Sequence, residues 1–168
     1  MNDLELFRKE KGEFFKTSRQ SPLTAEQKSE FSGLNYYPEN PSLRLEIKLE
    51  RLAQTEPVTL ATSTGDEQEY FHVGQVRFDV DGQEALLQIY EADYGFFVPF
   101  VDATAPKETY GAGCYLEPHD LGGDLLSVDF NLAYNPYCAY NEQWSCPLPP
   151  AANRLKVRIK AGEKKFHE

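Results

Sequence analysis

The residues of this chain that are best suited to chemistry are concentrated between positions 104 and 150. That stretch contains all three cysteines, five of the ten tyrosines and the single tryptophan. It also contains Lys107, the only cation between Arg77 and Arg154, in an interval with twelve acidic residues. A lysine in such surroundings either forms a structural ion pair or binds an anionic group of a ligand.

A second candidate feature is the strand expected around Asp129. Alternation along a strand places Ser127, Asp129 and Asn131 on one face, opposite an apolar face. The polar face is turned either to solvent or to a cleft, and in a cleft Asp129 is a candidate general base. A turn at Asn135-Pro136 would bring Tyr140 back towards this strand.

Together these observations give the hypothesis of one polar, tyrosine-rich pocket that binds a small polar molecule. In this pocket Lys107 and Asp129 are the candidate catalytic residues, and the phenols form its walls. The competing interpretation is a buried polar network that only fastens the C-terminal loop to the body of the fold. The residues predicted to converge on the pocket are Lys107, Tyr110, Asp129, Asn131, Tyr134 and Tyr140.

The cysteines leave three interpretations open. Cys138 and Cys146 are separated by seven residues, which is longer than the spacing of a zinc knuckle. Cys114 and His119 could complete a set of four ligands, but nothing in the spacing requires it. Buried inert thiols are the first expectation, a redox pair the second and a zinc site the third. We therefore expect no metal and no cofactor.

The overall charge restricts the partners. The formal net charge of −10 argues against binding nucleic acid or anionic membrane surfaces, because both need clustered cations. The polar start of the chain lacks the features of a signal peptide, and no apolar run is long enough to span a membrane. We therefore expect a cytoplasmic location, where thiols are reduced.

The elements that must position these residues follow from periodicity. We expect one domain over residues 1–168, with an N-terminal helical segment over 1–33 and a β-rich body over 43–160. Capping-box spacings at Asn2/Glu5 and Thr24/Gln27 indicate two helix starts. A tyrosine- and proline-rich loop spans 131–150, and the tail from residue 163 is expected to be loose.

Short alternating segments separated by turn residues fill the body. Asp81-Gly82 indicates a tight hairpin, Thr64 to Asp66 and Gly122-Gly123 indicate turns, and the apolar run over 96–101 indicates a central strand. Strands are also expected over 110–116 and 155–160. The fold class predicted is mostly β: an antiparallel barrel or two-sheet sandwich with one or two N-terminal helices.

Several segments carry a resemblance to a known family. They lie at residues 8–15, 21–24, 96–104, 108–113, 129–140, 146–150, 153–155 and 161–162. In these segments the chain resembles the family called domain of unknown function 1684. The resemblance covers nearly the whole chain, and it implies no established activity, cofactor or partner.

Function is thus unknown from the sequence, and whether the protein is an enzyme stays open. The first hypothesis is a small-molecule-binding protein or enzyme with its pocket in the 104–150 segment. The second is a non-enzymatic interaction module that uses the acidic surface or the proline- and tyrosine-rich region, and a flat apolar patch near Tyr137 and Trp144 would favour it. The third is a thiol or zinc site at Cys138 and Cys146.

Overall fold

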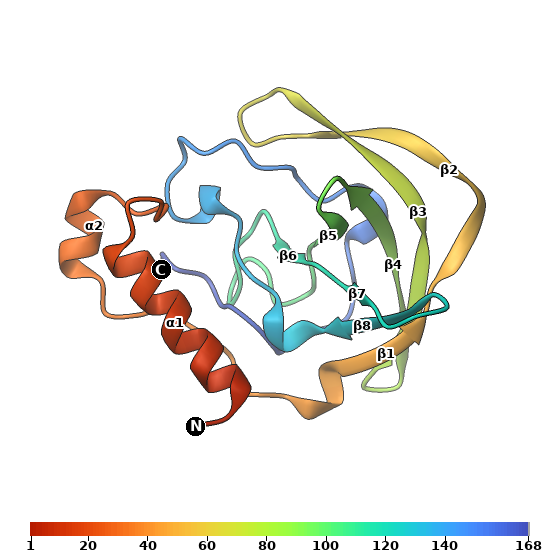
Figure 1. Ribbon diagram of the computed structural model, residues 1–168, viewed down its shortest axis with the longest axis horizontal. Helices are drawn as coiled ribbons and strands as arrows, with labels where there is room; N and C mark the ends of the chain where they lie inside the picture. The colour runs from red at the N-terminus through yellow and green to blue at the C-terminus, as the bar shows by residue number, and fades with distance from the viewer. Residues whose placement is uncertain (168) are drawn as a thin grey trace.

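The structure is a computed structural model, and it describes residues 1–167. The chain begins with helices α1 (Asp3–Thr17) and α2 (Ala25–Glu30). Both start in the predicted capping boxes, with the side chains of Asn2 and Thr24 accepting from the backbone N–H of Glu5 and Gln27. The two helices lie together at one end of the molecule, away from the sheets (Figure 1).

A five-stranded antiparallel sheet forms most of the body. Its strands are β2 (Glu50–Ala61), β3 (Glu67–Val80), β4 (Gln83–Ala92), β5 (Gly95–Phe100) and β6 (Cys114–Leu116), paired in chain order. The hairpin between β3 and β4 turns at Asp81 and Gly82, which both have positive φ angles, of 51° and 82°. This confirms the Asp-Gly hairpin, because a type I′ turn needs two residues in that conformation.

A smaller sheet packs beside it. Strand β8 (Leu125–Asp129) pairs with β1 (Arg44–Lys48) on one side and with β7 (His119–Asp120) on the other. Strand β1 is followed directly by β2, so the chain passes from one sheet to the other at this corner (Figure 1). The two sheets do not close into a barrel, so of the two predicted architectures the two-sheet one is observed.

The main core lies between the sheets and is apolar. Val76, Leu87, Ile89 and Leu126 are fully buried in it, as alternation along their strands predicts. A second cluster on the same body is aromatic and contains Tyr70, Tyr90, Phe97 and Tyr115 together with Cys138 and Cys146. A third joins the helices to the C-terminal part through Phe15, Leu23 and Tyr140.

Three local predictions are wrong. The strand expected over 110–116 is reduced to Cys114–Leu116, and residues 155–160 form no strand. Val157 and Ile159 are buried, as the alternation predicts, but this segment is not part of a sheet. The carbonyl of Val157 accepts from the backbone N–H of Ala103, and the N–H of Ile159 donates to the side chain of Asp102. The tail is not loose at its start, because Glu163 is 2% exposed and its backbone N–H donates to Ala133 O at 3.0 Å.

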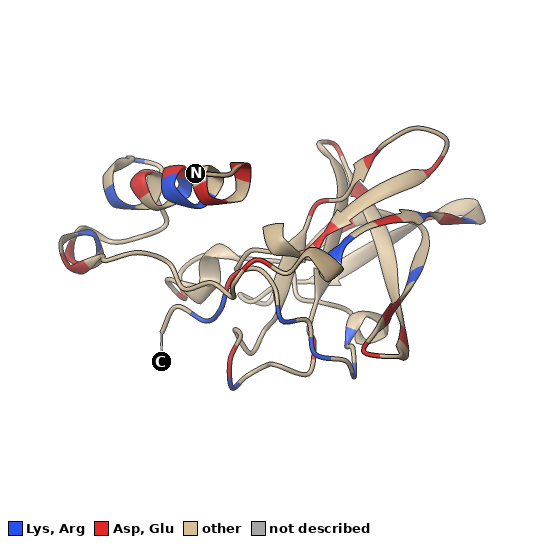
Figure 2. Cartoon of the chain, turned by 90° about the horizontal axis from the view of Figure 1, so that it is seen from below, with Lys and Arg blue, Asp and Glu red and all other residues tan. Residues whose placement is uncertain are grey.

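The rest of the C-terminal half is short turns. Single-turn 3-10 helices occupy Phe130–Leu132, Tyr137–Ala139 and Ala151–Asn153, and a fourth, Pro41–Leu43, precedes β1. Charges of both signs alternate on α1 and α2, whereas several blue segments lie on the coils near the C-terminus (Figure 2). The coils that follow β8 therefore carry both the cysteine pair and the basic part of an acidic protein.

Candidate functional site

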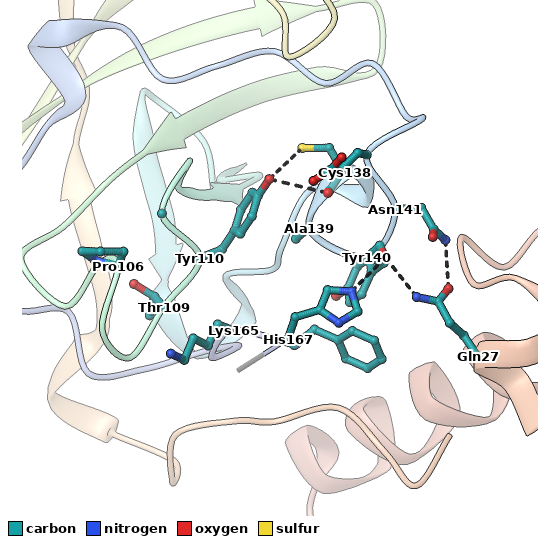
Figure 3. A pocket seen from close by; sticks show the side chains of 13 residues that line it. Gln27, Pro106, Thr109, Tyr110, Cys138, Ala139, Tyr140, Asn141, Lys165 and His167 are labelled. Carbon is teal, nitrogen blue, oxygen red and sulfur yellow. Dashed lines mark hydrogen bonds between the residues drawn. The ribbon is translucent and has the colours of Figure 1, made fainter. Parts of the chain in front are cut away.

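A cavity of about 640 Å³ lies where α2, the 106–111 loop, residues 138–142 and the tail meet. Its polar lining comes from chain segments far apart in sequence (Figure 3). Tyr110 comes from the loop before β6, Cys138 and Asn141 from the 3-10 turn and the residues after it, and Lys165 and His167 from the tail. We call this the Tyr110 cavity.

The wall formed by residues 138–142 is positioned by hydrogen bonds to the N-terminal segment. The Asn141 side-chain amide donates to Pro22 O at 2.6 Å and to Gln27 Oε1 at 2.9 Å. Gln27 in turn donates to Tyr140 O at 3.1 Å. These bonds, drawn in part in Figure 3, connect the start of α2 to the cavity wall.

The tail forms the opposite wall. The backbone N–H of Lys165 donates to Glu108 O at 3.1 Å, and the side chain of Asn35 donates to Lys165 O at 3.2 Å. The ring of His167 is hydrogen bonded to Tyr140 O through Nε2 at 3.0 Å. Hydrogen bonds therefore fix the backbone of Lys165 and the ring of His167, and both side chains line the cavity.

Two thiols lie at this site. Cys138 lines the cavity, and its backbone N–H donates to Cys146 Sγ at 3.3 Å. The phenol of Tyr110 donates to Cys138 Sγ at 3.7 Å. The neighbouring Cys146 thiol, together with the hydrogen bond from Tyr110, lowers the pKa of Cys138, while the neighbouring Cys138 thiol and burial raise the pKa of Cys146.

A smaller hollow of about 410 Å³ adjoins this cavity through Lys165, which lines both. It is also lined by Lys107 and Lys164, by Tyr36 and by Glu108. We call it the lysine hollow. A hydrogen bond from Tyr37 at 2.7 Å, together with the nearby cations Lys160, Lys164 and Arg158, lowers the pKa of Glu108.

The comparisons with known proteins bear on identity and not on activity. The model of the family described as "Protein of unknown function (DUF1684)" matches residues 29–164. The chain belongs to this family. A similar solved structure is the solution NMR structure of an uncharacterized protein from Haloarcula marismortui, which is 38% identical. The match covers 96% of this chain and 91% of that one, with a TM-score of 0.73. No curated protein gives a match.

The six residues predicted for one pocket of this DUF1684 protein do not line one cavity. Tyr110 and Tyr140 line the Tyr110 cavity, and Lys107 lines the lysine hollow. Asp129 lines a third hollow of about 540 Å³, next to Arg44 and the start of α1. The single predicted pocket is therefore divided, because the turn after β8 directs Asp129 to the α1 side.

Asp129 and Asn131 have local structural partners. The Asp129 carboxylate accepts from the Asn131 backbone and side chain at 3.0 and 2.9 Å and from Arg44 Nε at 3.2 Å. Asn131 is 2% exposed and also bonds to the backbone of Asn40. Asp129 caps the 3-10 turn Phe130–Leu132, so here the geometry agrees with the network interpretation.

Tyr134 and Tyr140 also donate to carboxylates. Tyr134 Oη donates to Glu117 at 2.7 Å, and Tyr140 Oη donates to the buried Glu163 at 2.6 Å. Glu163 forms an ion pair with Lys11 of α1. Sequence reasoning missed Glu163, Lys165 and His167, because a position in a polar tail carries no signal of burial or of a long-range partner.

Tyr137 and Trp144 are both half-buried. The two rings pack edge to face at 5.3 Å, and Trp144 Nε1 donates to Pro22 O at 3.3 Å.

In residues 1–167 no group of three or more His, Cys, Asp or Glu side chains could hold a metal ion. Neither helix in that range has the length and apolarity needed to cross a membrane.

Proposed function

We propose that this DUF1684 protein binds a small anionic molecule in the Tyr110 cavity and the lysine hollow. The observation that carries this proposal is the convergence of Lys107, Lys164 and Lys165 on two adjoining hollows. The two volumes are of the size that small-molecule sites in proteins have.

The electrostatics support an anionic ligand. The net charge of the chain is −10, yet six of its cations lie within residues 154–165 and the one acid there, Glu163, is buried. Within residues 1–167, none of the three lysines forms an ion pair with a carboxylate. A hollow lined by cations has a positive local potential, even in an acidic molecule, and this potential raises the local concentration of an anionic ligand.

The polar groups of the cavity supply directional contacts as well as charge. Asn141 and His167 lie on one side and Tyr110 and Thr109 on another (Figure 3). Among residues 1–167, Glu142 is the one carboxylate in the lining of this cavity, and Glu108 is the one in the lining of the lysine hollow. Glu108 already accepts a hydrogen bond from Tyr37, so its charge is partly compensated. No residue is assigned a catalytic role in this proposal.

The test is a ligand screen by melting temperature with inorganic phosphate, citrate and a nucleoside monophosphate, at constant ionic strength. At a ligand concentration 100 times Kd the native state gains about 2.7 kcal/mol, which raises Tm by several degrees. Constant ionic strength separates site binding from general screening. The proposal predicts that at least one of the three anions raises Tm and gives saturable binding by calorimetry.

Variants locate the effect. We expect Lys107→Ala and Lys165→Ala each to weaken binding about tenfold or more, since a hydrogen bond to a charged group contributes roughly 1.5–3 kcal/mol. Lys156→Ala is the matched control, because it removes an exposed cation of the same segment that lines neither hollow. A response that is absent for all three anions, or equal in Lys107→Ala and Lys156→Ala, would overturn the proposal.

A further inference from the structure

We propose that Cys138 and Cys146 form a redox-active thiol pair, in which Cys138 reduces a small hydroperoxide that enters through the Tyr110 cavity and Cys146 then closes a disulfide. This inference uses the cavity as the route to the sulfur. It does not depend on the anion of the proposed function.

The two cysteines are held close together by the fold. Pro136 begins the 3-10 turn Tyr137–Ala139, which directs the Cys138 backbone N–H at Cys146 Sγ at 3.3 Å. Cys146 is fixed independently, since its own N–H donates to Ser63 Oγ at 3.1 Å and its carbonyl accepts from Ser63 N at 2.9 Å. The two cysteines are therefore neighbours, and both lie outside the strands.

The surroundings activate one sulfur of the pair. Cys138 Sγ accepts from Tyr110 Oη, and burial together with this hydrogen bond raises the pKa of Tyr110, so the phenol stays a donor. The neighbouring Cys146 thiol, together with the hydrogen bond from Tyr110, lowers the pKa of Cys138 and so favours its thiolate. The thiolate is the reactive form of a cysteine, and low thiol pKa with a nearby resolving cysteine is characteristic of redox sites.

The burial of the two sulfurs restricts the oxidant to a small molecule. Cys138 is 5% exposed and Cys146 is 6% exposed, so neither sulfur can be approached by the disulfide of another protein. Cys138 nevertheless is one of the residues that line the cavity, and its sulfur lies beside the Tyr110 hydroxyl, so the cavity is the route that a small molecule would take to it (Figure 3). Cys114 provides an internal contrast, because it lines neither hollow and burial raises its pKa.

The chemistry balances in two steps. The Cys138 thiolate attacks the distal oxygen of the hydroperoxide, so an S–O bond forms as the O–O bond breaks, and the departing alkoxide takes a proton to become an alcohol or water. The product is a sulfenic acid at Cys138. Cys146 then attacks that sulfur, and hydroxide leaves as water with the Cys146 proton. Two electrons pass from the sulfurs to the peroxide, and a small thiol reductant restores the pair.

The experiment begins with the unaltered protein and hydrogen peroxide. The expected product has lost two hydrogen atoms in mass, and a thiol reductant restores the original mass. A non-reducing digest with a protease that cleaves after Asp and Glu cuts at Asp129 and Glu142 and so separates all three cysteines, and a disulfide is identified by the peptides it joins. We expect the peptides of Cys138 and Cys146 to be joined and that of Cys114 to be free.

Variants separate the two steps. Cys146→Ala should stop the reaction at a sulfenic acid on Cys138 that a dimedone probe captures, and Tyr110→Phe should slow the first step several-fold. Cys114→Ala is the matched control and should react like the unaltered protein. The rate should remain substantial below the pH at which an ordinary thiol ionises, since Cys138 has a lowered pKa.

The proposal is overturned if native protein keeps all three thiols while unfolded protein is oxidised at the same peroxide concentration. It is also overturned if Cys114 joins the disulfide, or if Cys138 reacts no faster than Cys114. Each of these results leaves the anion site untouched, because Lys107→Ala and Lys165→Ala test that site without involving a thiol.

Discussion

The five-stranded sheet and the C-terminal corner of this protein are stabilised in different ways. By C-terminal corner we mean residues 130–167 together with the face of α1 that they contact. The sheet has long ladders between neighbouring strands, with a register shift after Arg51 and another after His72, and an apolar face containing Leu87 and Ile89. The corner has short 3-10 turns, and it is held by side chains that bond to each other and to distant backbone.

The buried residues show this contrast most clearly. In the sheet the fully buried side chains are aliphatic and aromatic, whereas the corner buries Asn131, Asn135, Asn153 and Glu163. Asn153 is 0% exposed and bonds to the backbone of Gln88 and Pro99. A buried polar group stabilises only while its partners remain, so single substitutions should cost more in the corner than in the sheet turns.

The largest effect is expected at Glu163. Its carboxylate accepts from Tyr140 Oη at 2.6 Å and from the Asn135 N–H at 3.3 Å, and it pairs with Lys11. Glu163→Ala leaves the Lys11 ammonium without its partner and should lower the free energy of unfolding by about 3–5 kcal/mol. Urea denaturation of the variant and the unaltered protein measures this difference.

The control for Glu163 is Glu13, an exposed glutamate of α1. Glu13→Ala should change the free energy of unfolding by about 0.5 kcal/mol or less. Changing both partners, in Lys11→Met with Glu163→Leu, should cost less than Glu163→Ala alone, because no charge is left buried. Equal losses in Glu163→Ala and Glu13→Ala would show that polar contacts do not hold the corner.

The same contrast explains how much of the molecule could be predicted. The turn at Asp81-Gly82 and the alternation from Val76 to Val80 depend on neighbours in sequence, and both were confirmed. The partner of Glu163 is Lys11, which is 152 positions away in the chain. No local pattern identifies such a pair, so the tail was wrongly expected to be loose.

The candidate site was predictable to the same limited extent. The aromatic and cysteine content of residues 104–150 located the region, and Tyr110 and Tyr140 do line one cavity. The prediction joined Asp129 to Lys107, although Asp129 is used to cap the turn after β8. Lys164 and Lys165, which line the lysine hollow, follow the buried Glu163, and only the fold shows that this segment returns to the 106–111 loop.

A second prediction compares two glycines with nearly the same backbone conformation. Gly162 has φ of 84° and Gly82 has φ of 82°. A Cβ at Gly162 would lie 2.7 Å from Phe130 O and 2.8 Å from Ala133 O, whereas one at Gly82 would meet nothing within 4 Å. Gly162→Ala therefore adds a clash with backbone to the strain and should cost about 2–4 kcal/mol.

Gly82→Ala is the matched control for Gly162→Ala, because it introduces the same strain without the clash. The difference between the two in urea denaturation measures how tightly the corner is packed. If the two variants lose the same stability, the tail moves away from Ala133 at little cost and the corner is looser than the sheet.

The smallest effect is expected at the hairpin itself. Gly82→Val places a β-branched side chain at positive φ and should cost about 1–2 kcal/mol, all of it from the backbone conformation because the site is open. Gly12→Ala is the control: Gly12 lies in α1, a Cβ there meets nothing within 4 Å, and the change should stabilise by about 0.5–1 kcal/mol. If Gly82→Val lowers the free energy of unfolding and Gly12→Ala raises it, the backbone conformation at each glycine decides the effect, and not the removal of a glycine. A Gly82→Val variant as stable as the unaltered protein would mean that the β3–β4 pairing tolerates another turn, and the sheet would then be more adaptable at its tip than the C-terminal corner is at Gly162.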